Sequence, residues 1–459
     1  MGGGQSSTGG SSTTSQPVSP LQVAAGQCFD ELADTDQVVT AAAFEHLFSG
    51  PAPGFGSRLF KALFGQEKPK VGKPAFVEAF ARLLSRDARQ SETIVKYLTV
   101  FSDGGRVQPL AALTCACKLA IQLSAAGGDD EATVDVSSVH FLEAAAKSVG
   151  ESSSLTVNDV SEWVQCNMPG LFDALHCWLE RAIWSSGSGA SDVSAFELPR
   201  LVSSSGSPAA SDLLGVDGMW LLSTFLPPCY LGHHKAKMAS SGAAAATSST
   251  GASAGGQWNL LYNSRDQGLS LNRFKHHVMD YRGPNVCCIR CDRDTVFALG
   301  VDGEWRESST AWGGNECVLA QLRPAVCPLA SGPRLLVLNE KTRGIRLGLS
   351  VGRDQSRPAL TIDESLDKLT VSPPPSSSAG QSGEQLTVRA VEVWGCGGAD
   401  LQDAQRKQKD WDKKQVERRR QVKRPGRWEE NPDAMLLEWG GVHTTSNFGV
   451  DRKGDEDKE

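Results

Sequence analysis

The sequence predicts an α+β protein with a helical first half, a strand-rich second half and a charged helix near its C-terminal end. Three observations carry this prediction. Apolar residues recur at helical spacing in the first half, strand-like runs bounded by turn residues follow residue 258, and a strongly polar stretch begins at residue 400. With 459 residues, the chain is long enough for about two or three domains.

Changes of composition along the chain predict five segments. Stretches of Gly, Ser, Thr and Ala have little to bury and mark flexible connections. The predicted segments are a disordered N-terminus with an acylation motif at residues 1–20, a helical region at 21–238, a flexible insert at 239–256, a strand-rich domain at 257–398, and a charged helix and tail at 399–459.

The helical region has the helix–loop–helix pattern of EF-hand proteins. Its loops lack the row of carboxylates that calcium requires: the run of Asp34, Thr35 and Asp36 is too short, and Arg106 stands where a calcium loop carries acidic residues. We therefore expect an EF-hand-like region without calcium loops.

The second half alternates short apolar runs with turn residues. A helix is expected at residues 273–280, ahead of the turn formed by Gly283 and Pro284. Strands are expected at residues 286–291, 295–299, 335–338, 345–349, 359–362 and 386–394, with a turn at 292–294.

The composition excludes several classes of protein. Lys and Arg total 46 against 53 Asp and Glu, and a net charge of −7 argues against general nucleic-acid binding, which needs a concentrated basic face. No apolar run reaches the ~18–20 residues of a membrane span, and residues 1–20 lack the basic start and apolar core of a secretion signal. We therefore expect a cytoplasmic protein whose 12 cysteines are reduced and mostly buried.

Cys288 and Cys291 have the C-x-x-C spacing that zinc sites use in pairs. No second pair accompanies them, and the adjacent His276 and His277 face apart on a helix. On a strand the two thiols point to opposite faces, so we expect buried strand cysteines rather than a metal site. Hydrolase, P-loop and dinucleotide fingerprints are also absent from the sequence, so we expect no catalytic residue and no cofactor.

The N-terminus matches the acylation pattern M-G-x-x-x-[ST], with Gly2 as the acceptor and Ser6 at the last position. The alternative is an uninformative disordered start, because short motifs have many false positives. One myristoyl chain gives a membrane affinity on the order of 10⁴ M⁻¹, so stable docking needs a second contact. No basic cluster lies nearby, which favours a protein partner as that contact.

The stretch at residues 400–424 holds ten Lys and Arg against five Asp and Glu. Its basic run at Arg418, Arg419 and Arg420 has three interpretations: a solvated helix face, a contact with anionic lipid, or a helix that docks into an acidic groove of a partner. Trp411 favours the last interpretation, because exposed tryptophans often anchor interfaces.

A series of residues between positions 258 and 394 resembles the TLDc-domain family. Each short sequence match is weak by itself, but the order and spacing of the matches together are specific to the family. The matching residues are Trp258, Tyr262, Ser264, Gly268, Ser270, Phe274, Gly283, Pro284, Trp305, Gly314, Cys317, Pro324, Gly348, Val393 and Trp394. The overall architecture, with its acylation motif and charged C-terminal extension, is similar to the myristoylated, mTOR-associated TLDc proteins and their fungal relatives.

The resemblance implies a β-sandwich flanked by helices. It also implies a non-enzymatic, membrane-associated protein that binds the vacuolar-type proton ATPase or mTOR complex components at lysosomal or endosomal membranes. Protection against oxidative stress, through redox chemistry of the cysteines, is the alternative that the family suggests. We expect Trp258, Trp305 and Trp394 to be core residues rather than ligand contacts.

Overall fold

The structure is a computed structural model of the chain. It describes residues 19–48, 54–65, 68–84, 90–103, 105–125, 140–150, 155–185, 196–231, 256–372, 383–421, 436 and 439–440. Gly2 and residues 239–255 of the predicted insert lie outside the described residues. The chain divides into two compact units, Met1–Ala404 and Gln405–Glu459.

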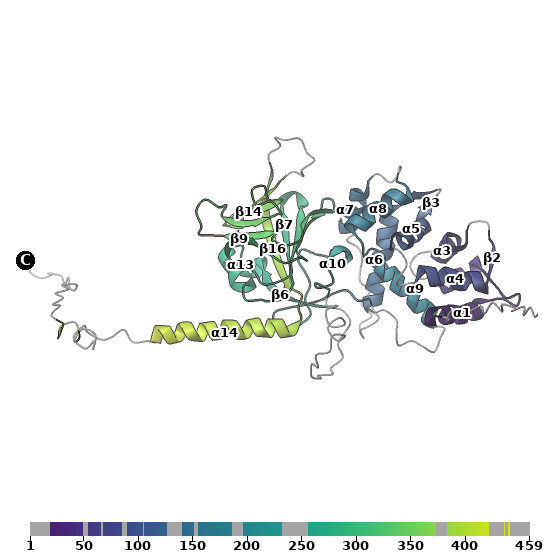
Figure 1. Ribbon diagram of the computed structural model, residues 1–459, viewed down its shortest axis with the longest axis horizontal. Coiled ribbons are helices and arrows are strands. Elements are labelled where there is room, and N and C mark those ends of the chain that lie inside the picture. The colour runs from purple at the N-terminus through teal and green to yellow at the C-terminus, as the bar shows by residue number, and fades with distance from the viewer. Residues whose placement is uncertain are drawn as a thin grey trace, which may run out of the picture. The chain divides into compact units, whose positions relative to one another are not determined.

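The first unit begins with two helix–loop–strand–helix motifs that pair through their strands (Figure 1). Val39 lies opposite Val71 in antiparallel register, and Gln37, with a φ of 57°, makes the sharp turn that a glycine makes in calcium loops. The elements are α1 (Pro20–Leu32), β1 (Val38–Thr40), α2 (Ala41–Leu47), α3 (Phe55–Phe64), β2 (Lys70–Gly72) and α4 (Lys73–Leu83). Ser19 starts α1 with a capping box, and Thr40 caps α2.

A second pair of helix–loop–helix motifs follows and repeats this arrangement. Arg106 and Thr156 form an isolated antiparallel β-bridge, and the Val107 amide donates to the Leu155 carbonyl oxygen over 3.2 Å. The two loops therefore pair as β1 and β2 do. The elements are α5 (Gln90–Val100), β3 (Ser102–Asp103), β4 (Arg106–Val107), α6 (Pro109–Ala125), α7 (His140–Val149) and α8 (Val157–Asn167). This duplication is the EF-hand-like region that the sequence predicts.

Helix α9 (Asp173–Ser185) joins the two pairs. It packs against α1 of the first pair and α6 of the second. The Trp178 ring lies 5.8 Å from the ring of Phe48 and 5.8 Å from that of Phe55, each edge to face. The helices therefore share one hydrophobic core instead of forming separate modules.

A large sheet forms the rest of the first unit. Its strand order is β11-β10-β8-β7-β16-β15-β14-β13-β12-β9, with β6 also paired to β16 and β5 paired to β6. All of these pairs are antiparallel except β5 with β6. The strands are β5 (Arg200–Val202), β6 (Gln257–Asn263), β7 (Asn285–Cys291), β8 (Val296–Val301), β9 (Ser308–Trp312), β10 (Val318–Arg323), β11 (Cys327–Ser331), β12 (Leu336–Asn339), β13 (Gly348–Val351), β14 (Leu360–Ile362), β15 (Lys368–Val371) and β16 (Glu384–Gly395).

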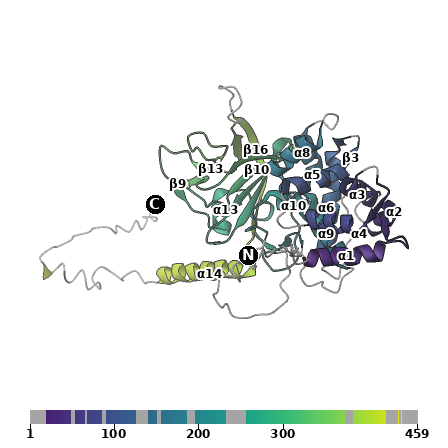
Figure 2. The same ribbon diagram turned by 45° about the vertical axis from the view of Figure 1, so that its right-hand side comes forward.

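Strand β16 connects the two halves of this sheet. Its N-terminal part pairs with β15, and its C-terminal part lies between β6 and β7. Residues of both halves, such as Leu299 of β8 and Leu338 of β12, belong to one buried cluster. The halves thus form the predicted sandwich, with α13 (Leu271–Val278) beside it (Figure 2). The short helix α12 (Ser264–Gln267) contacts β6 and β16.

The helices and the sheet pack against each other within the first unit. The Ser148 hydroxyl of α7 accepts a hydrogen bond from the Val326 amide over 2.9 Å. The guanidinium of Arg323 lies 5.7 Å from the centre of the Phe141 ring. One buried cluster contains side chains from the helices and from the outer face of β7, so the helical region and the sheet share a core. Helix α10 (Val216–Phe225) belongs to it.

Two sequence predictions differ from the structure. The strand predicted at 345–349 is wrong in its first part, because β13 begins at Gly348 and residues 345–347 form an exposed turn. Gly348 has a φ of 93°, and its ideal Cβ would lie 2.1 Å from the Ile362 carbonyl oxygen, so the backbone turns sharply there. Strand β5 lies inside the region at 21–238 that was expected to be helical.

Candidate functional site

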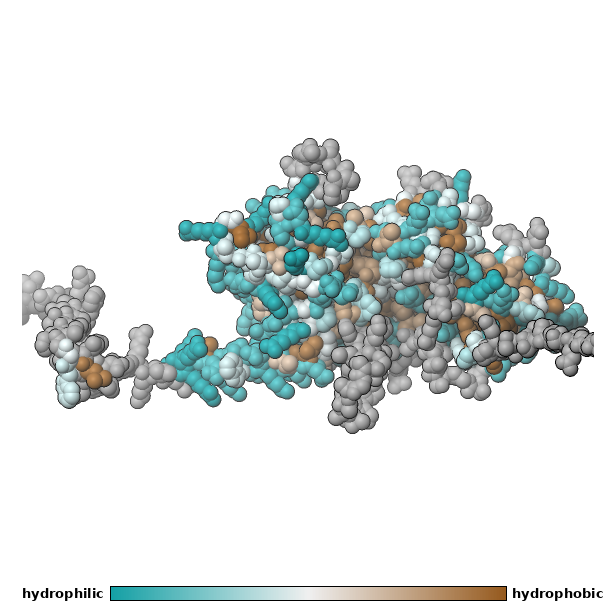
Figure 3. Space-filling model, in the orientation of Figure 1, coloured by the Kyte–Doolittle hydropathy of each residue, from teal (hydrophilic) through white to brown (hydrophobic). Residues whose placement is uncertain are grey.

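The predicted contact residues near the C-terminal end lie on α14 (Ala399–Gln421) and are exposed. Trp411 is 56% exposed, and Arg418, Arg419 and Arg420 form an exposed cationic end in the last turn. Trp411 and Arg418 are seven residues apart and therefore share one helix face. The surface of α14 is predominantly hydrophilic (Figure 3). The helix thus combines one large aromatic side chain with a cationic end, which suits an acidic partner surface.

The three signature tryptophans are buried in the first unit. Trp258, Trp305 and Trp394 are at most 2% exposed. Their indole N–H groups donate to the Tyr230 carbonyl oxygen at 2.8 Å, the Asn285 amide oxygen at 2.7 Å and the Glu392 carboxylate at 3.1 Å, respectively. Each ring is therefore both packed and hydrogen-bonded, as a core residue is.

Gly314 and Cys317 shape a loop around the carboxylate of Asp302. This carboxylate accepts hydrogen bonds from the amides of Gly314 at 2.9 Å and Glu316 at 3.1 Å, and from the Cys317 thiol at 3.2 Å. A Cβ on Gly314 would collide with the carboxylate, at 2.1 Å. The absence of a side chain at this position allows the backbone to approach Asp302.

The remaining signature residues also hold the fold. The Tyr262 hydroxyl donates to the Gly268 carbonyl oxygen at 2.7 Å, and the Ser264 hydroxyl accepts from the Val391 amide at 2.8 Å. Phe274 packs on Tyr262 and Trp305, and Val393 lies in the core of the sandwich. The Pro284 carbonyl oxygen accepts a hydrogen bond from the Cys396 amide, and Gly283 lies close to the Tyr281 ring. Ser270 precedes α13, and the peptide bond before Pro324 is cis.

The buried carboxylate of Glu392, which was not predicted from the sequence, links the segment at Ser211 and Asp212 to the sheet. Glu392 is 1% exposed and accepts hydrogen bonds from the Ser211 hydroxyl, the Asp212 amide at 2.8 Å and the Trp394 indole. Burial raises its pKa, although these hydrogen bonds act in the opposite direction. The signal was a single acid in the apolar run of Val391, Val393 and Trp394, where an acid needs a partner.

Most of the cysteine thiols are buried. Cys288 belongs to the cluster shared with the helices, whereas Cys291 belongs to the sandwich interior, so the predicted opposite orientation of the two is confirmed. Burial raises the pKa to about 12 for the thiols of Cys115, Cys117, Cys177, Cys287, Cys291 and Cys317. Thiols with such pKa values carry almost no thiolate at neutral pH and are poor nucleophiles. Only Cys166 and Cys327 among the cysteines are exposed.

The acids of the first EF-hand-like loop are engaged by neighbouring protein groups. Asp34 accepts hydrogen bonds from the Thr35 amide and hydroxyl, and Asp36 lies 3.7 Å from the Lys70 ammonium. Among the residues that the structure describes, no group of three or more His, Cys, Asp or Glu side chains is placed to hold a metal ion. The described helices also include none with the length and apolar composition of a bilayer crossing.

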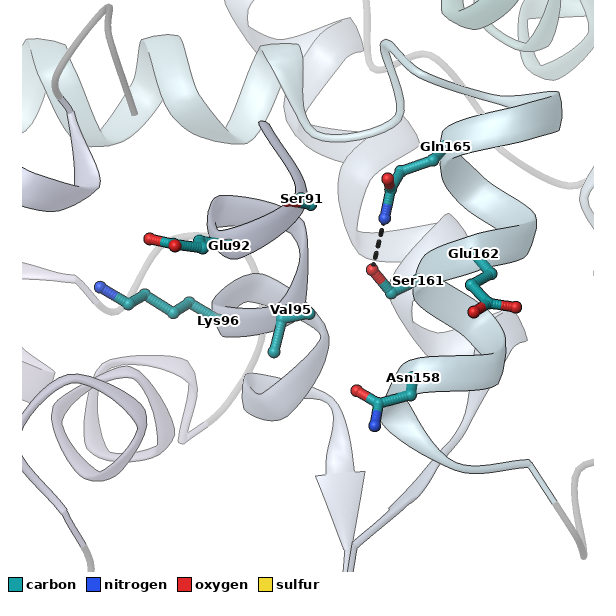
Figure 4. Close-up of a pocket in the computed structure, with 8 residues that line it drawn as sticks. All are labelled: Ser91, Glu92, Val95, Lys96, Asn158, Ser161, Glu162 and Gln165. Atoms are coloured by element: carbon teal, nitrogen blue, oxygen red, sulfur yellow. Dashed lines mark hydrogen bonds between the residues drawn. The ribbon is translucent and has the colours of Figure 1, made fainter. Parts of the chain in front are cut away.

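A shallow groove of about 530 Å³ lies between α5 and α8 (Figure 4). Ser91 and Val95 line it from α5, and Asn158, Ser161 and Gln165 line it from α8. The Gln165 amide donates to the Ser161 hydroxyl over 3.0 Å. Glu92 and Lys96 of α5 and Glu162 of α8 complete the lining, which contains no histidine or thiol.

The TLDc domain model matches residues 246–397. The matched segment contains every strand from β6 to β16 and all fifteen signature residues that the sequence analysis names. No curated protein matches the chain. Strand β5 and the Ser211 segment lie before the match but pack on the same sheet, so the folded domain begins upstream of it.

Proposed function

We propose that this chain, whose residues 246–397 form a TLDc domain, is a non-enzymatic adaptor that regulates the vacuolar-type proton ATPase and mTOR signalling at lysosomal or endosomal membranes. The proposal places it with the myristoylated, mTOR-associated TLDc proteins and their fungal relatives. In this scheme the protein is cytoplasmic and peripheral on the membrane. Its partners are the proton ATPase, mTOR complex components, or both.

The observation that carries the proposal is α14, where exposed Trp411 and an exposed cationic end are not used to hold the fold. Side chains held in solvent on a helix of 23 residues are available to a partner. By contrast, the signature residues of the TLDc domain make their contacts inside the domain. We therefore assign partner capture to α14 and the rigid frame to the sheet.

Capture of the proton ATPase from solubilised membranes tests this role of α14. We expect Trp411→Ala, and separately the triple change of Arg418, Arg419 and Arg420 to Gln, to reduce capture severalfold. The matched control changes three other exposed cations of the same helix, Lys407, Lys413 and Lys414, to Gln. Equal capture by wild type and both test variants would refute the docking role.

Membrane association through Gly2 is a separate part of the proposal. The support is the acylation pattern at residues 1–6. We expect Gly2→Ala to move protein from the lysosomal membrane fraction to the soluble fraction in cell fractionation. An unchanged distribution would remove the lipid anchor and leave the α14 proposal standing.

Protection against oxidative stress through thiol chemistry is the alternative function. The burial of most thiols and their raised pKa values speak against it, because reaction with peroxide needs an exposed thiolate. In a labelling time course on the native protein, we expect rapid reaction at Cys166 and slower reaction at Cys327, because burial raises the pKa of the Cys327 thiol. Rapid labelling of any buried thiol would instead favour the alternative.

A further inference from the structure

The turn between β12 and β13 is a surface that none of the roles above uses. Residues 341–347 are exposed without interruption, and they contain no acidic residue. They combine three cations with two aliphatic side chains: Lys341, Arg343, Arg346, Ile345 and Leu347. The two aliphatic side chains are 39% and 43% exposed, respectively.

One buried side chain holds this turn in shape. Asn339 is 2% exposed, and its amide group donates to the carbonyl oxygens of Thr342 at 2.9 Å, Ile345 at 3.2 Å and Arg346 at 3.3 Å. Its carbonyl oxygen accepts the Thr342 amide at 2.9 Å. The exposed apolar residues therefore project from an ordered turn, and less entropy is lost when they bind.

The charges at the base of the turn neutralise one another. Lys275 lies 2.8 Å from the Glu307 carboxylate and 2.7 Å from that of Glu340, and Lys341 lies 3.2 Å from Glu307. Two lysines thus face two glutamates. The guanidinium groups of Arg343 and Arg346, in contrast, take part in no ion pair with any residue that the structure describes.

The neighbouring turn between β14 and β15 carries acids that limit the long-range attraction. Asp363, Glu364 and Asp367 stand against Lys368 there. The Asp363 carboxylate is engaged by its own turn, through the Ser365 hydroxyl at 2.7 Å and two backbone amides. Binding at this edge therefore depends on direct contact of the two guanidinium groups and the two aliphatic side chains.

We propose that residues 341–347 dock on an anionic lipid surface. The guanidinium groups of Arg343 and Arg346 bind lipid phosphates in the bidentate manner that arginine allows, while Ile345 and Leu347 enter the boundary of the acyl chains. A lipid surface fits better than a protein partner because the turn lacks the aromatic residues that anchor protein interfaces. This role rests on the membrane association proposed above and supplies the second contact that one acyl chain needs.

Vesicle sedimentation with the full chain carrying Gly2→Ala tests the inference, because the acyl chain then contributes nothing. We expect binding to vesicles of phosphatidylcholine with phosphatidylserine and much weaker binding to phosphatidylcholine alone. Arg343→Gln with Arg346→Gln should lower the binding by about fivefold per arginine. Ile345→Ser with Leu347→Ser should weaken it on both kinds of vesicle.

The matched control is Arg290→Gln with Arg389→Gln, which removes two exposed cations elsewhere on the sheet. This control should bind as the parent does, and unchanged circular dichroism should show that every variant is folded. Absence of binding by the parent chain, or binding by the turn variants equal to that of the parent, would overturn the inference. Loss of proton-ATPase capture by the turn variants without any vesicle binding would assign the turn to a protein partner instead. Neither result bears on α14 or Gly2, which are tested separately.

Discussion

The TLDc sheet and helix α14 use their polar residues in opposite ways. In the sheet, Glu392 and Asn285 lie inside the protein and accept hydrogen bonds from other parts of the chain. The partly exposed Asp302, directly after β8, accepts hydrogen bonds from the Gly314 loop. In α14, the cations Arg418, Arg419 and Arg420 are exposed. Polar side chains therefore serve the fold in the sheet, whereas those at the end of α14 are available for association.

The comparison teaches which substitutions separate stability from binding. A change at a buried residue of the sheet lowers the free energy of unfolding, so a loss of function caused by such a change follows from unfolding. A change at an exposed position of α14, such as Trp411 or Arg418, removes no buried contact, so an effect on function reports association.

Trp258→Ala should destabilise the protein by about 3–5 kcal/mol, because it leaves a cavity and removes the donor to the Tyr230 carbonyl oxygen. Urea unfolding followed by circular dichroism measures this change. Trp258→Phe keeps most of the ring volume and should cost less. A loss below about 1 kcal/mol for the alanine variant would contradict the assignment of Trp258 to the core.

Glu392→Gln should change how stability depends on pH. Burial raises the pKa of Glu392 in the folded protein, so the folded state binds the proton more tightly than the unfolded chain does. Its contribution is complete below the unfolded pKa of about 4.3 and is lost as the pH rises through the folded-state pKa.

Urea unfolding of wild type and Glu392→Gln at several pH values checks this dependence. The advantage of the wild type should be largest near the low end of the series and should decrease as the pH rises. An advantage that grows with pH would mean that the three donors lower the folded-state pKa below that of the unfolded chain.

Trp411→Ala should change the free energy of unfolding by no more than about 0.5 kcal/mol, because the side chain is 56% exposed. This is the same substitution as in Trp258→Ala, placed in the other region. If the two variants lose similar stability in the same urea experiment, the contrast between the sheet and α14 does not hold.

Calcium should leave the unfolding midpoint unchanged. A loop that binds calcium would stabilise the folded protein by about 2.7 kcal/mol when the ion is at 100 times its dissociation constant. Thermal unfolding with calcium and with a chelator compares the two conditions. A calcium-dependent rise in the midpoint would show that the EF-hand-like loops bind the ion despite their composition.

Local sequence patterns predicted the fold class and part of the strand set, but they missed β6, β9, β10, β11 and β15. The strands at β7 and β8 and the turn between them follow from apolar runs on either side of Asp292 and Asp294, and the structure has them there. The expectation that the EF-hand-like loops bind no calcium rests on single positions such as Arg106 and stays a prediction. These features depend on residues close together in the chain, which is why they could be predicted from the sequence.

Features that depend on distant residues were not predicted. Ile345, Leu347 and Leu349 alternate as in a strand, yet the Asn339 amide donates to the Ile345 and Arg346 carbonyl oxygens and holds this part of the chain in a turn. Strand β5 exists because β6, more than fifty residues later, offers an edge for pairing. The bond between Ser211 and Glu392 joins positions 181 residues apart, and no local pattern identifies the partner.

The place of β16 in the sheet has a consequence for synthesis of the chain. This strand is the last of the sheet to leave the ribosome, yet it pairs with β6, β7 and β15, which are made earlier. Until residue 395 has emerged, β6 and β7 have an unpaired edge, and exposed edges favour aggregation. A nascent chain that ends before β16 is thus a natural client for chaperones, and a premature stop upstream of it should yield insoluble product.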